Sequence, residues 1–170
     1  ILGPEMRSTG EVMGIDRDFG MAFAKSQIGS GSRIPTEGSV FVSVKDSDKD
    51  KILNPVSDLF SLGFDIYATD GTAEFLNNNN IQTKKINKVL QGSPHIVEMI
   101  SEKKISLVLN TTETPQAIKD SKSIRRSALE SETPYYTTVS GANAVVMAIK
   151  AIKNNEMSIK TIQSFGQLLS

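Results

Sequence analysis

Residues 69–72, which read Thr-Asp-Gly-Thr, have types and a spacing that suit the binding of a phosphate group. They follow FDIYA at 64–68, an alternation of apolar and polar residues that is typical of a β-strand, and they precede a predicted helix that begins near Ala73. A strand that passes through glycine into a helix directs free backbone N–H groups at one point, and threonine hydroxyls add donors. Taken alone, the turn favours a simpler interpretation, in which Thr72 caps the helix and Gly71 adopts an unusual φ.

The composition excludes several classes of site. The 170 residues suffice for one well-buried domain with attached segments. Because 19 basic residues balance 19 acidic ones, the net charge does not favour binding to nucleic acid or to an anionic membrane. There is no cysteine, which excludes thiolate zinc sites and a cysteine nucleophile and fits a cytoplasmic location. The single histidine, His95, excludes multi-histidine metal clusters. No apolar run approaches membrane-spanning length. The chain lacks an initiator methionine, and we expect it to be excised from a longer one.

Strand and helix patterns alternate along the chain. The predicted strands are residues 40–44, 65–68, 83–87, 105–109 and 135–138, and a helix pattern follows each of them. This order predicts a three-layer α/β/α sandwich with a five-stranded parallel sheet, doubly wound and Rossmann-like. A further short helix is predicted at 18–25, before a linker rich in glycine and serine. Residues 157–163 alternate like an edge strand, with a helix as an equal alternative.

Several details of the helices are also predicted. The helix after the first strand should begin near Asp50, so that Pro55 loses no intrahelical hydrogen bond, and should end with Gly63 as its C-cap. Ser93 should be the N-cap of the helix that precedes the fourth strand. In the helix that follows the fourth strand, Leu129 is expected to face inward.

Polar residues are predicted at the carboxyl end of every strand. In a doubly wound sheet the ligand crevice lies beyond those ends. One polar strand end would be ordinary, but five together indicate a site for a small anion, to which Lys49 and Lys88 add positive charge. The residues at the five ends are Ser43; Thr69; Lys88; Asn110, Thr111 and Thr112; and Thr137 and Thr138.

Several sequence runs, in order along nearly the whole chain, carry a resemblance to a known family. They are LGPEMRSTGEVMG at 2–14, FVSV at 41–44, ATDGTA at 68–73, NKV at 87–89, PHI at 94–96, LNTT at 109–112 and IRRSAL at 124–129. With these runs the chain resembles the C-terminal regulatory domain of the carbamoyl phosphate synthetase large subunit, which has a methylglyoxal synthase-like fold. The first and last runs are quite specific to that subunit, whereas the turn at 69–72 occurs across the superfamily.

The resemblance implies a domain organisation and a function. Residues 1–16 would be the tail of the preceding carbamoyl phosphate-making ATP-grasp domain, 17–38 a short helix and linker, and 39–170 the regulatory domain. In bacterial members UMP inhibits, IMP can activate and ornithine activates from a nearby site, which controls carbamoyl phosphate supply to pyrimidine and arginine synthesis. The implied partners are the rest of the large subunit, the glutaminase small subunit and further copies of the chain. The domain itself is expected to be non-catalytic and to hold no cofactor, since ATP, Mg²⁺ and K⁺ belong to the catalytic domains of this ligase.

The resemblance also assigns roles to individual positions. The implied phosphate-binding residues are Lys49, Thr69, Gly71, Thr72 and Lys88. The implied residues on the ribose and base side are Ser43, Asn110 and Thr112. The ornithine contacts that the chain retains would be Leu2, Tyr135 and Thr137, whereas the acidic contacts belong to another domain. Asp70 stands where some relatives have histidine, and an acid beside a phosphate is unfavourable unless it points away or caps the helix.

Two enzymes of the same fold and a pure assembly domain are the alternatives. A methylglyoxal synthase-like phosphate lyase acting on a triose phosphate needs a carboxylate base and a histidine acid around the phosphate. Its Gly-Gly-Asp stretch corresponds to QGSPH at 91–95, and Glu113 is the nearest acid to the place of its second aspartate. A cyclohydrolase resembling the purine-pathway enzyme lacks its motif in the same way. His95 is expected to be structural, Arg125 and Arg126 to form a solvated helix face or an ion pair, and no catalytic or metal-binding residue is predicted.

Overall fold

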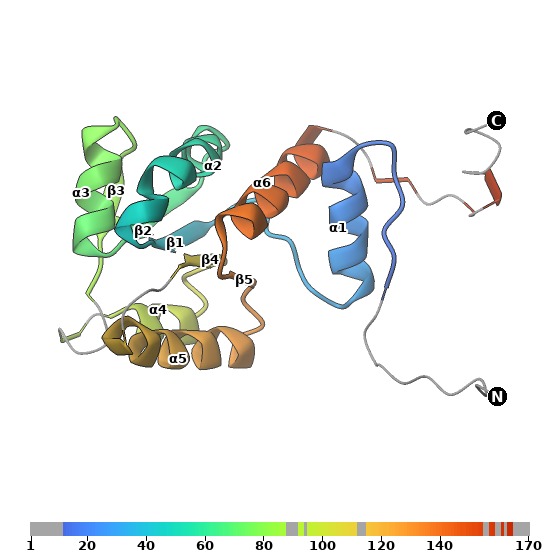
Figure 1. Ribbon diagram of the computed structural model, residues 1–170. Helices are drawn as coiled ribbons and strands as arrows, with labels where there is room; N and C mark the ends of the chain where they lie inside the picture. The colour runs from blue at the N-terminus through green and yellow to red at the C-terminus, as the bar shows by residue number, and fades with distance from the viewer. Residues whose placement is uncertain are drawn as a thin grey trace.

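Five parallel strands form one sheet (Figure 1). A computed structural model describes residues 12–87, 92, 93, 95–111, 115–154, 157, 158, 161, 163 and 164, with the backbone alone for 115–120. The strands are β1 (Ser39–Ser43), β2 (Asp65–Ala68), β3 (Thr83–Lys85), β4 (Leu107–Asn110) and β5 (Tyr135–Tyr136). They lie in the order β3-β2-β1-β4-β5, and every neighbouring pair is parallel. The predicted parallel sheet is therefore confirmed, with small shifts at the strand ends.

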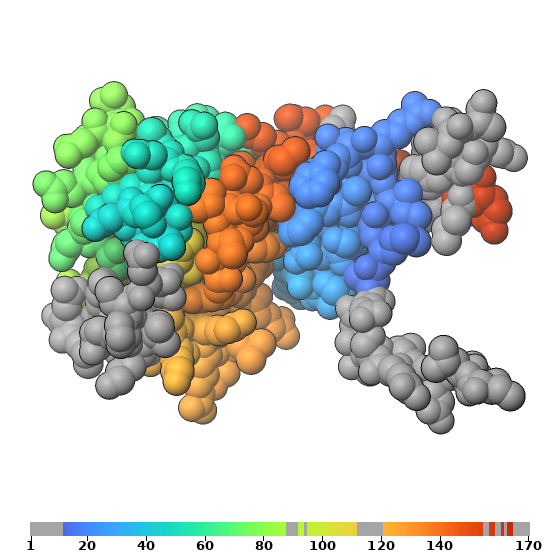
Figure 2. All heavy atoms as spheres, in the orientation of Figure 1, coloured from blue at the N-terminus to red at the C-terminus, as the bar shows by residue number. Residues whose placement is uncertain are grey.

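Helices cover both faces of the sheet. α2 (Lys49–Ser61), α3 (Asp70–Asn78) and α6 (Val139–Asn154) lie on one face, and α4 (Ile96–Ser101) and α5 (Pro115–Glu130) lie on the other (Figure 1). The predicted α/β/α sandwich is thus confirmed. α1 (Phe19–Gly29) lies outside the sandwich against α6, where Figure 2 shows its blue atoms beside the orange ones. No helix in the described part of the chain is both long enough and apolar enough to cross a membrane.

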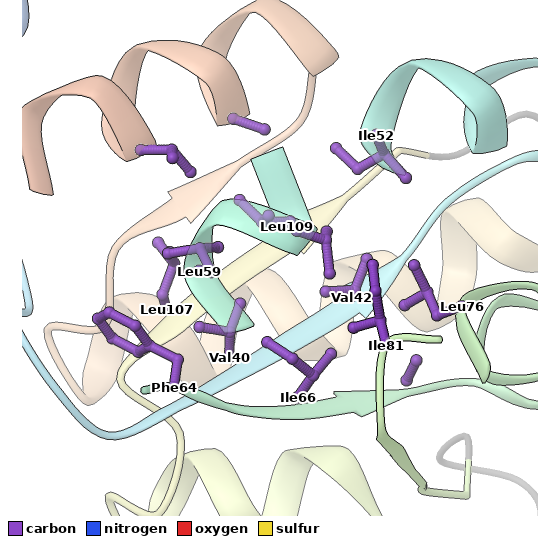
Figure 3. Close-up of a cluster of buried hydrophobic side chains, with 14 of the residues drawn as sticks. Val40, Val42, Ile52, Leu59, Phe64, Ile66, Leu76, Ile81, Leu107 and Leu109 are labelled. Atoms are coloured by element: carbon purple, nitrogen blue, oxygen red, sulfur yellow. The ribbon is translucent and has the colours of Figure 1, made fainter. Parts of the chain in front are cut away.

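The strands build two separate cores because alternate side chains point to opposite faces of the sheet. Figure 3 shows the larger core, in which residues of β1, β2 and β4 meet residues of α2 and α3: Val40, Val42, Ile66, Leu107 and Leu109 with Ile52, Leu59 and Leu76. The smaller core lies under α4 and α5 and contains Phe41 and Val108. Ser43 and Asn110 continue the alternation of these two residues, so they belong to the α4–α5 face, at the carboxyl edge of the sheet.

The two ends of α2 were predicted with different success. α2 begins at Lys49, directly after the short 3₁₀ helix Asp46–Asp48, and Pro55 lies beyond the first four N–H groups, so its ring removes an intrahelical hydrogen bond. The expectation that Pro55 loses no hydrogen bond is therefore wrong, and Pro55 is buried in the helix interior. The C-cap is Leu62, one residue before the predicted Gly63, and Gly63 ends the helix as the next residue. Its φ is +91°, its N–H donates to the Phe60 carbonyl at 3.0 Å, and the next N–H donates to the Leu59 carbonyl at 3.1 Å, as in a Schellman motif.

The N-cap of α4 is His95, two residues beyond the predicted Ser93. His95 Nδ1 accepts from the Glu98 N–H at 3.4 Å, and the Glu98 carboxylate accepts from the His95 N–H at 3.0 Å, which forms a capping box. The Ser93 hydroxyl donates to the same carboxylate at 2.9 Å. Ser93 therefore supports the cap without being it, and the bonds from His95 and Ser93 lower the pKa of Glu98.

Two further local predictions can be compared with the structure. Leu129 is 80% exposed, and the inward position of α5 is taken by its neighbour Ala128, which is fully buried. The inward placement of Leu129 is therefore wrong, because the side of α5 that faces the sheet carries Ala128 and not Leu129. In the stretch 157–163, residues 157 and 158 are not in a strand and residue 163 is helical.

Candidate functional site

Three polar side chains form a row across the carboxyl edge of the sheet. Thr69, Ser43 and Asn110 end or follow the neighbouring strands β2, β1 and β4. The Thr69 hydroxyl donates to Ser43 Oγ at 3.3 Å, and Ser43 lies in register with Asn110 on the next strand. Thr69 and Asn110 are only 7% and 3% exposed, so packing holds their side chains in place. The predicted convergence of polar residues from separate strand ends is therefore present for these three.

The first turn of α3 lies beside this row. Thr69 is its N-cap residue, but the Thr69 side chain makes no capping bond and donates instead to Ser43. α3 begins at Asp70, so Gly71 and Thr72 are already helical, and the φ of Gly71 is not positive. The predicted N-cap role of Thr72 and the unusual φ of Gly71 are therefore both wrong. Thr72 Oγ1 accepts from the N–H of Val44, the first residue after β1, at 3.3 Å. The side chain of the N-cap residue, Thr69, does not bond to the first N–H groups of α3.

Lys49 brings a positive charge to the same turn. It is the first residue of α2, and its Nζ lies 3.6 Å from the place that a Cβ on Gly71 would occupy. Nζ also lies 2.8 Å from Asp46 Oδ1, and this hydrogen bond, together with the Lys49 charge, holds the pKa of Asp46 below its ordinary value. The Lys49 side chain is 22% exposed and that of Asp46 93%, so Asp46 is a solvated counter-ion that another anion could replace. Lys49, Thr69, Gly71 and Thr72 are called the cradle below.

Asp70 faces a lysine at the surface. Lys85 Nζ lies 3.9 Å from Asp70 Oδ1, and the two side chains are 61% and 69% exposed. The negative charge that the sequence places in the turn is thus balanced by a cation outside the cradle. Because both side chains are solvated, this pair is expected to be weak and sensitive to salt.

Three of the predicted site residues, Leu2, Lys88 and Thr112, lie outside the described residues. The ladder of β3 ends at Lys85, but Asn87, the neighbour of Lys88, forms an isolated parallel bridge with His95. The roles assigned to Leu2, Lys88 and Thr112 therefore stay predictions.

Asn110 and Tyr135, which were predicted to contact two different ligands, are hydrogen-bonded to each other. Asn110 Nδ2 donates to Tyr135 Oη and to Ser121 Oγ, both at 2.7 Å. These bonds join the end of β4 to β5 and to α5. Ser121 was not singled out from the sequence, and no local signal could have found it, because only the order of the strands and the packing of α5 bring the three residues together.

Thr137 lies in a separate polar cavity of about 410 Å³. The cavity opens at the ends of β1, β4 and β5, and its lining includes Lys45, Lys51, Asp48 and Thr111. Two lysines and one aspartate make the described lining net positive, which is unfavourable for a ligand with two ammonium groups. The described residues around Thr137 therefore do not make an ornithine site by themselves.

Ionisable residues near this edge are held in structural contacts. His95 belongs to the capping box of α4, and Asp46 and Asp70 form ion pairs with lysines. Farther along α5, Arg126 pairs with Glu130 at 2.9 Å, which confirms an ion pair for one of the two arginines. Within the described ranges, no three histidine, aspartate or glutamate side chains are grouped so that they could hold a metal ion.

The fold defines a class of protein: a parallel α/β domain in which polar side chains gather at the carboxyl edge of the sheet. The cradle offers an ammonium, two hydroxyls and the N-terminus of a nine-residue helix, which are the groups that bind phosphate in such folds. Comparison with known families agrees with this class. A family model described as "MGS-like domain" matches residues 51–137, and the chain belongs to this family.

Curated relatives make the likeness more specific. The chain is 50% identical over 97% of its length to the carbamoyl phosphate synthase large chain of Brucella suis, and 46% identical over 97% to that of a Nostoc species. It is 48% identical over 90% of its length to a protein of Aquifex aeolicus named "Carbamoyl phosphate synthase large chain, C-terminal section", of which it covers 28%. The chain spans only 14% of the Brucella protein and 15% of the Nostoc protein. The resemblance predicted from the sequence is confirmed.

A solved structure shares the fold. Methylglyoxal synthase from Elizabethkingia anophelis superimposes with a TM-score of 0.55, over 66% of this chain and 79% of that one, at 18% sequence identity. At this identity the likeness establishes the methylglyoxal synthase-like fold and carries no conclusion about activity.

Proposed function

We propose that the chain is the regulatory domain of a carbamoyl phosphate synthase large chain, and that its cradle binds the phosphate of a nucleoside monophosphate. The effectors would be UMP as an inhibitor and IMP as an activator. The observation that carries this proposal is that the Lys49 ammonium lies next to the first turn of α3, beside the row of Thr69, Ser43 and Asn110. A phosphate in the cradle would place its ester oxygen, and hence the sugar, toward that row.

The charges and dipoles of the cradle favour a dianion. The positive end of the α3 dipole, the uncapped N–H groups and the Lys49 ammonium all act at the same point. The hydroxyls of Thr69 and Thr72 each already have one protein partner, which fixes their positions. Lys88 and Thr112 would complete the site on the phosphate and ribose sides.

A regulatory role without chemistry of its own is supported by the contacts of the ionisable groups. An acid–base reaction at the cradle would need a free carboxylate and a free histidine. The carboxylates beside the cradle, Asp46 and Asp70, are solvated partners of lysines, and His95, the single histidine, is held in a helix cap, so no histidine acid faces the cradle. In the longer protein the domain would control the supply of carbamoyl phosphate to pyrimidine and arginine synthesis, together with ornithine bound partly through residues of other domains.

The test is titration calorimetry of this chain with UMP, IMP and ornithine, together with an assay of methylglyoxal formation from dihydroxyacetone phosphate. We expect at least one nucleotide to bind with one-to-one stoichiometry and no methylglyoxal to form. If neither nucleotide binds, the proposed function is wrong. Methylglyoxal above the background of a heat-denatured sample would favour the phosphate lyase instead.

A further inference from the structure

α1 is apolar on all of its sides, which is unusual for a helix at the surface of a domain. Among its 11 residues the polar side chains are those of Lys25, Ser26 and Gln27. Lys25 pairs with Asp16 at 2.7 Å, and Gln27 accepts from the Tyr136 hydroxyl at 3.4 Å, so these groups bond within the domain. A helix of this composition is ordinarily covered by protein all round.

Two sides of α1 are covered closely (Figure 1). α6 lies against one side, where a Cβ on Gly20 would collide with the carbonyl oxygen of Met147. Residues 12–16 cross another side, where a Cβ on Gly14 would collide with the carbonyl oxygen of Ala22. Because backbone meets backbone at both places, α1 is held in one position, and the side chains around it form a surface of fixed shape.

The remaining surroundings of α1 are apolar and exposed. Among the described residues eight large apolar side chains are exposed, and five of them lie on α1, on the segment before it or on the adjoining α6: Val12, Met13, Phe19, Ile28 and Met147. Met13 is 73% exposed and Phe19 56%. These five residues are called the α1 surface below. Exposed apolar side chains that gather in one region of a domain mark a site of contact with another protein.

We propose that the α1 surface packs against the part of a longer large chain that precedes residue 1. The chain spans 14% of the Brucella protein and 15% of the Nostoc protein, so most of such a protein lies outside the structure. The Aquifex relative is named for the C-terminal section, which puts the remainder on the N-terminal side, toward which residues 12–16 lead. The inference rests on the proposed place of the chain within a large chain and not on nucleotide binding, so a failure of UMP and IMP to bind would leave it standing.

Covalent attachment makes such a contact favourable. Since the two parts belong to one chain, each is present to the other at an effective concentration that short linkers raise to about the millimolar range. An apolar surface of moderate size can therefore hold the domain in place without the area that two separate proteins need. A second copy of the chain, which has to bind from solution, lacks this advantage.

The experiment is hydroxyl-radical footprinting, read by mass spectrometry, of this chain and of the intact large chain assembled with its small subunit. In this chain, Met13 and Phe19 should be modified readily, whereas Met21, which is 5% exposed, should not. In the intact large chain, modification of Met13 and Phe19 should fall at least about fivefold, because the core of an interface excludes water. The matched control is Leu129, which is 80% exposed on α5 and should change by less than about twofold.

A pair of variants separates the contact from folding. In the intact large chain, Met13→Asp/Met147→Asp should return the modification of Phe19 to at least about half of its value in this chain, because burying a carboxylate in an apolar contact is costly. Leu129→Asp, the matched control, should leave Phe19 protected. In this chain by itself, the double variant should leave the thermal midpoint within about a few degrees, since both methionines are exposed.

Three outcomes would overturn the inference. Equal modification of Met13 and Phe19 in this chain and in the large chain would mean that nothing covers the α1 surface. An equal fall at Leu129 would show general shielding of the domain instead of a defined contact. Protection of Met13 and Phe19 in this chain by itself would assign the surface to a second copy, if dilution abolishes the protection, or to another segment of the same chain, if it does not.

Discussion

Replacement of Lys49 is the sharpest test of the cradle. Its ammonium lies against the first turn of α3 and forms an ion pair with the carboxylate of Asp46, which is almost fully solvated. We expect Lys49→Ala to leave the thermal midpoint nearly unchanged, because a pair with a solvated partner contributes little to folding. Nucleotide binding should suffer far more. Loss of one charge-assisted hydrogen bond removes about 1.5–3 kcal/mol, which raises the dissociation constant by about tenfold to a hundredfold.

The counter-ion makes the same prediction more specific. In Lys49→Ala, the Asp46 carboxylate would remain near the phosphate without its cation, so the loss should lie toward the upper end of that range. Asp46→Asn alone should instead tighten binding a few-fold, since the ligand no longer competes with a carboxylate for Lys49.

The assay is calorimetry with UMP at fixed ionic strength, and Lys84→Ala is the control. Lys84 carries the same charge and also forms an ion pair, at 2.9 Å from Asp65, at the opposite end of β2. An unchanged UMP affinity in Lys49→Ala, with the fold intact by circular dichroism, would remove Lys49 from the site. Equal losses in Lys49→Ala and Lys84→Ala would show a diffuse positive field instead of a defined contact.

Four other predictions follow. Lys88→Ala should weaken UMP binding by about tenfold to a hundredfold in the same assay, and no change would remove Lys88 from the phosphate site. Ornithine should bind this chain no better than millimolar, because the described lining around Thr137 sets two lysines against a single aspartate; micromolar affinity would mean a self-contained site. Gly63→Ala should lower the unfolding free energy in urea by about 1–2 kcal/mol, since residue 63 has a φ of +91°. Burial raises the pKa of Tyr136 from 10.0 to about 12, so stability is fully present below pH 10 and should fall as the pH rises toward 12. Tyr136→Phe should remove that part of the alkaline loss seen in pH-dependent unfolding.

The sheet could be predicted because its strands carry strong local signals. Residues 40–44 and 105–109 are apolar on both faces, which is the pattern of buried parallel strands, and glycine or proline separates most elements. The position of Ser43 and Thr69 at the carboxyl edge follows directly from that topology, because every strand of a parallel sheet ends at the same edge. The two side chains come into contact because β1 and β2 are neighbours in the sheet.

What the sequence missed depends on contacts between elements distant in the chain. Nothing near Asn110 indicates that its side chain is hydrogen-bonded to Tyr135 and Ser121, since one partner is in β5 and the other in α5. The inward position of α5 was also misplaced by one residue, to Leu129, because apolar spacing alone does not fix the rotation of a helix about its axis. Helix starts were misplaced for a related reason: a serine before a proline looks like a cap, but the capping box of His95 and Glu98 decides where α4 begins.

The cap of α3 shows how a local rule fails at the proposed binding site. The side-chain oxygen of a threonine before a helix ordinarily accepts a hydrogen bond from an N–H of the first turn, and loss of such a cap costs about 1 kcal/mol. Here the Thr69 hydroxyl is turned across the sheet to Ser43, and Thr72 is turned to the backbone after β1. Both threonines therefore bind the neighbouring strand, and the N-terminus of α3 is left open toward Lys49. An uncapped helix start beside a lysine has poorly satisfied N–H donors, and a bound anion would satisfy them, so the loss of the cap is the feature expected if the proposed site is used.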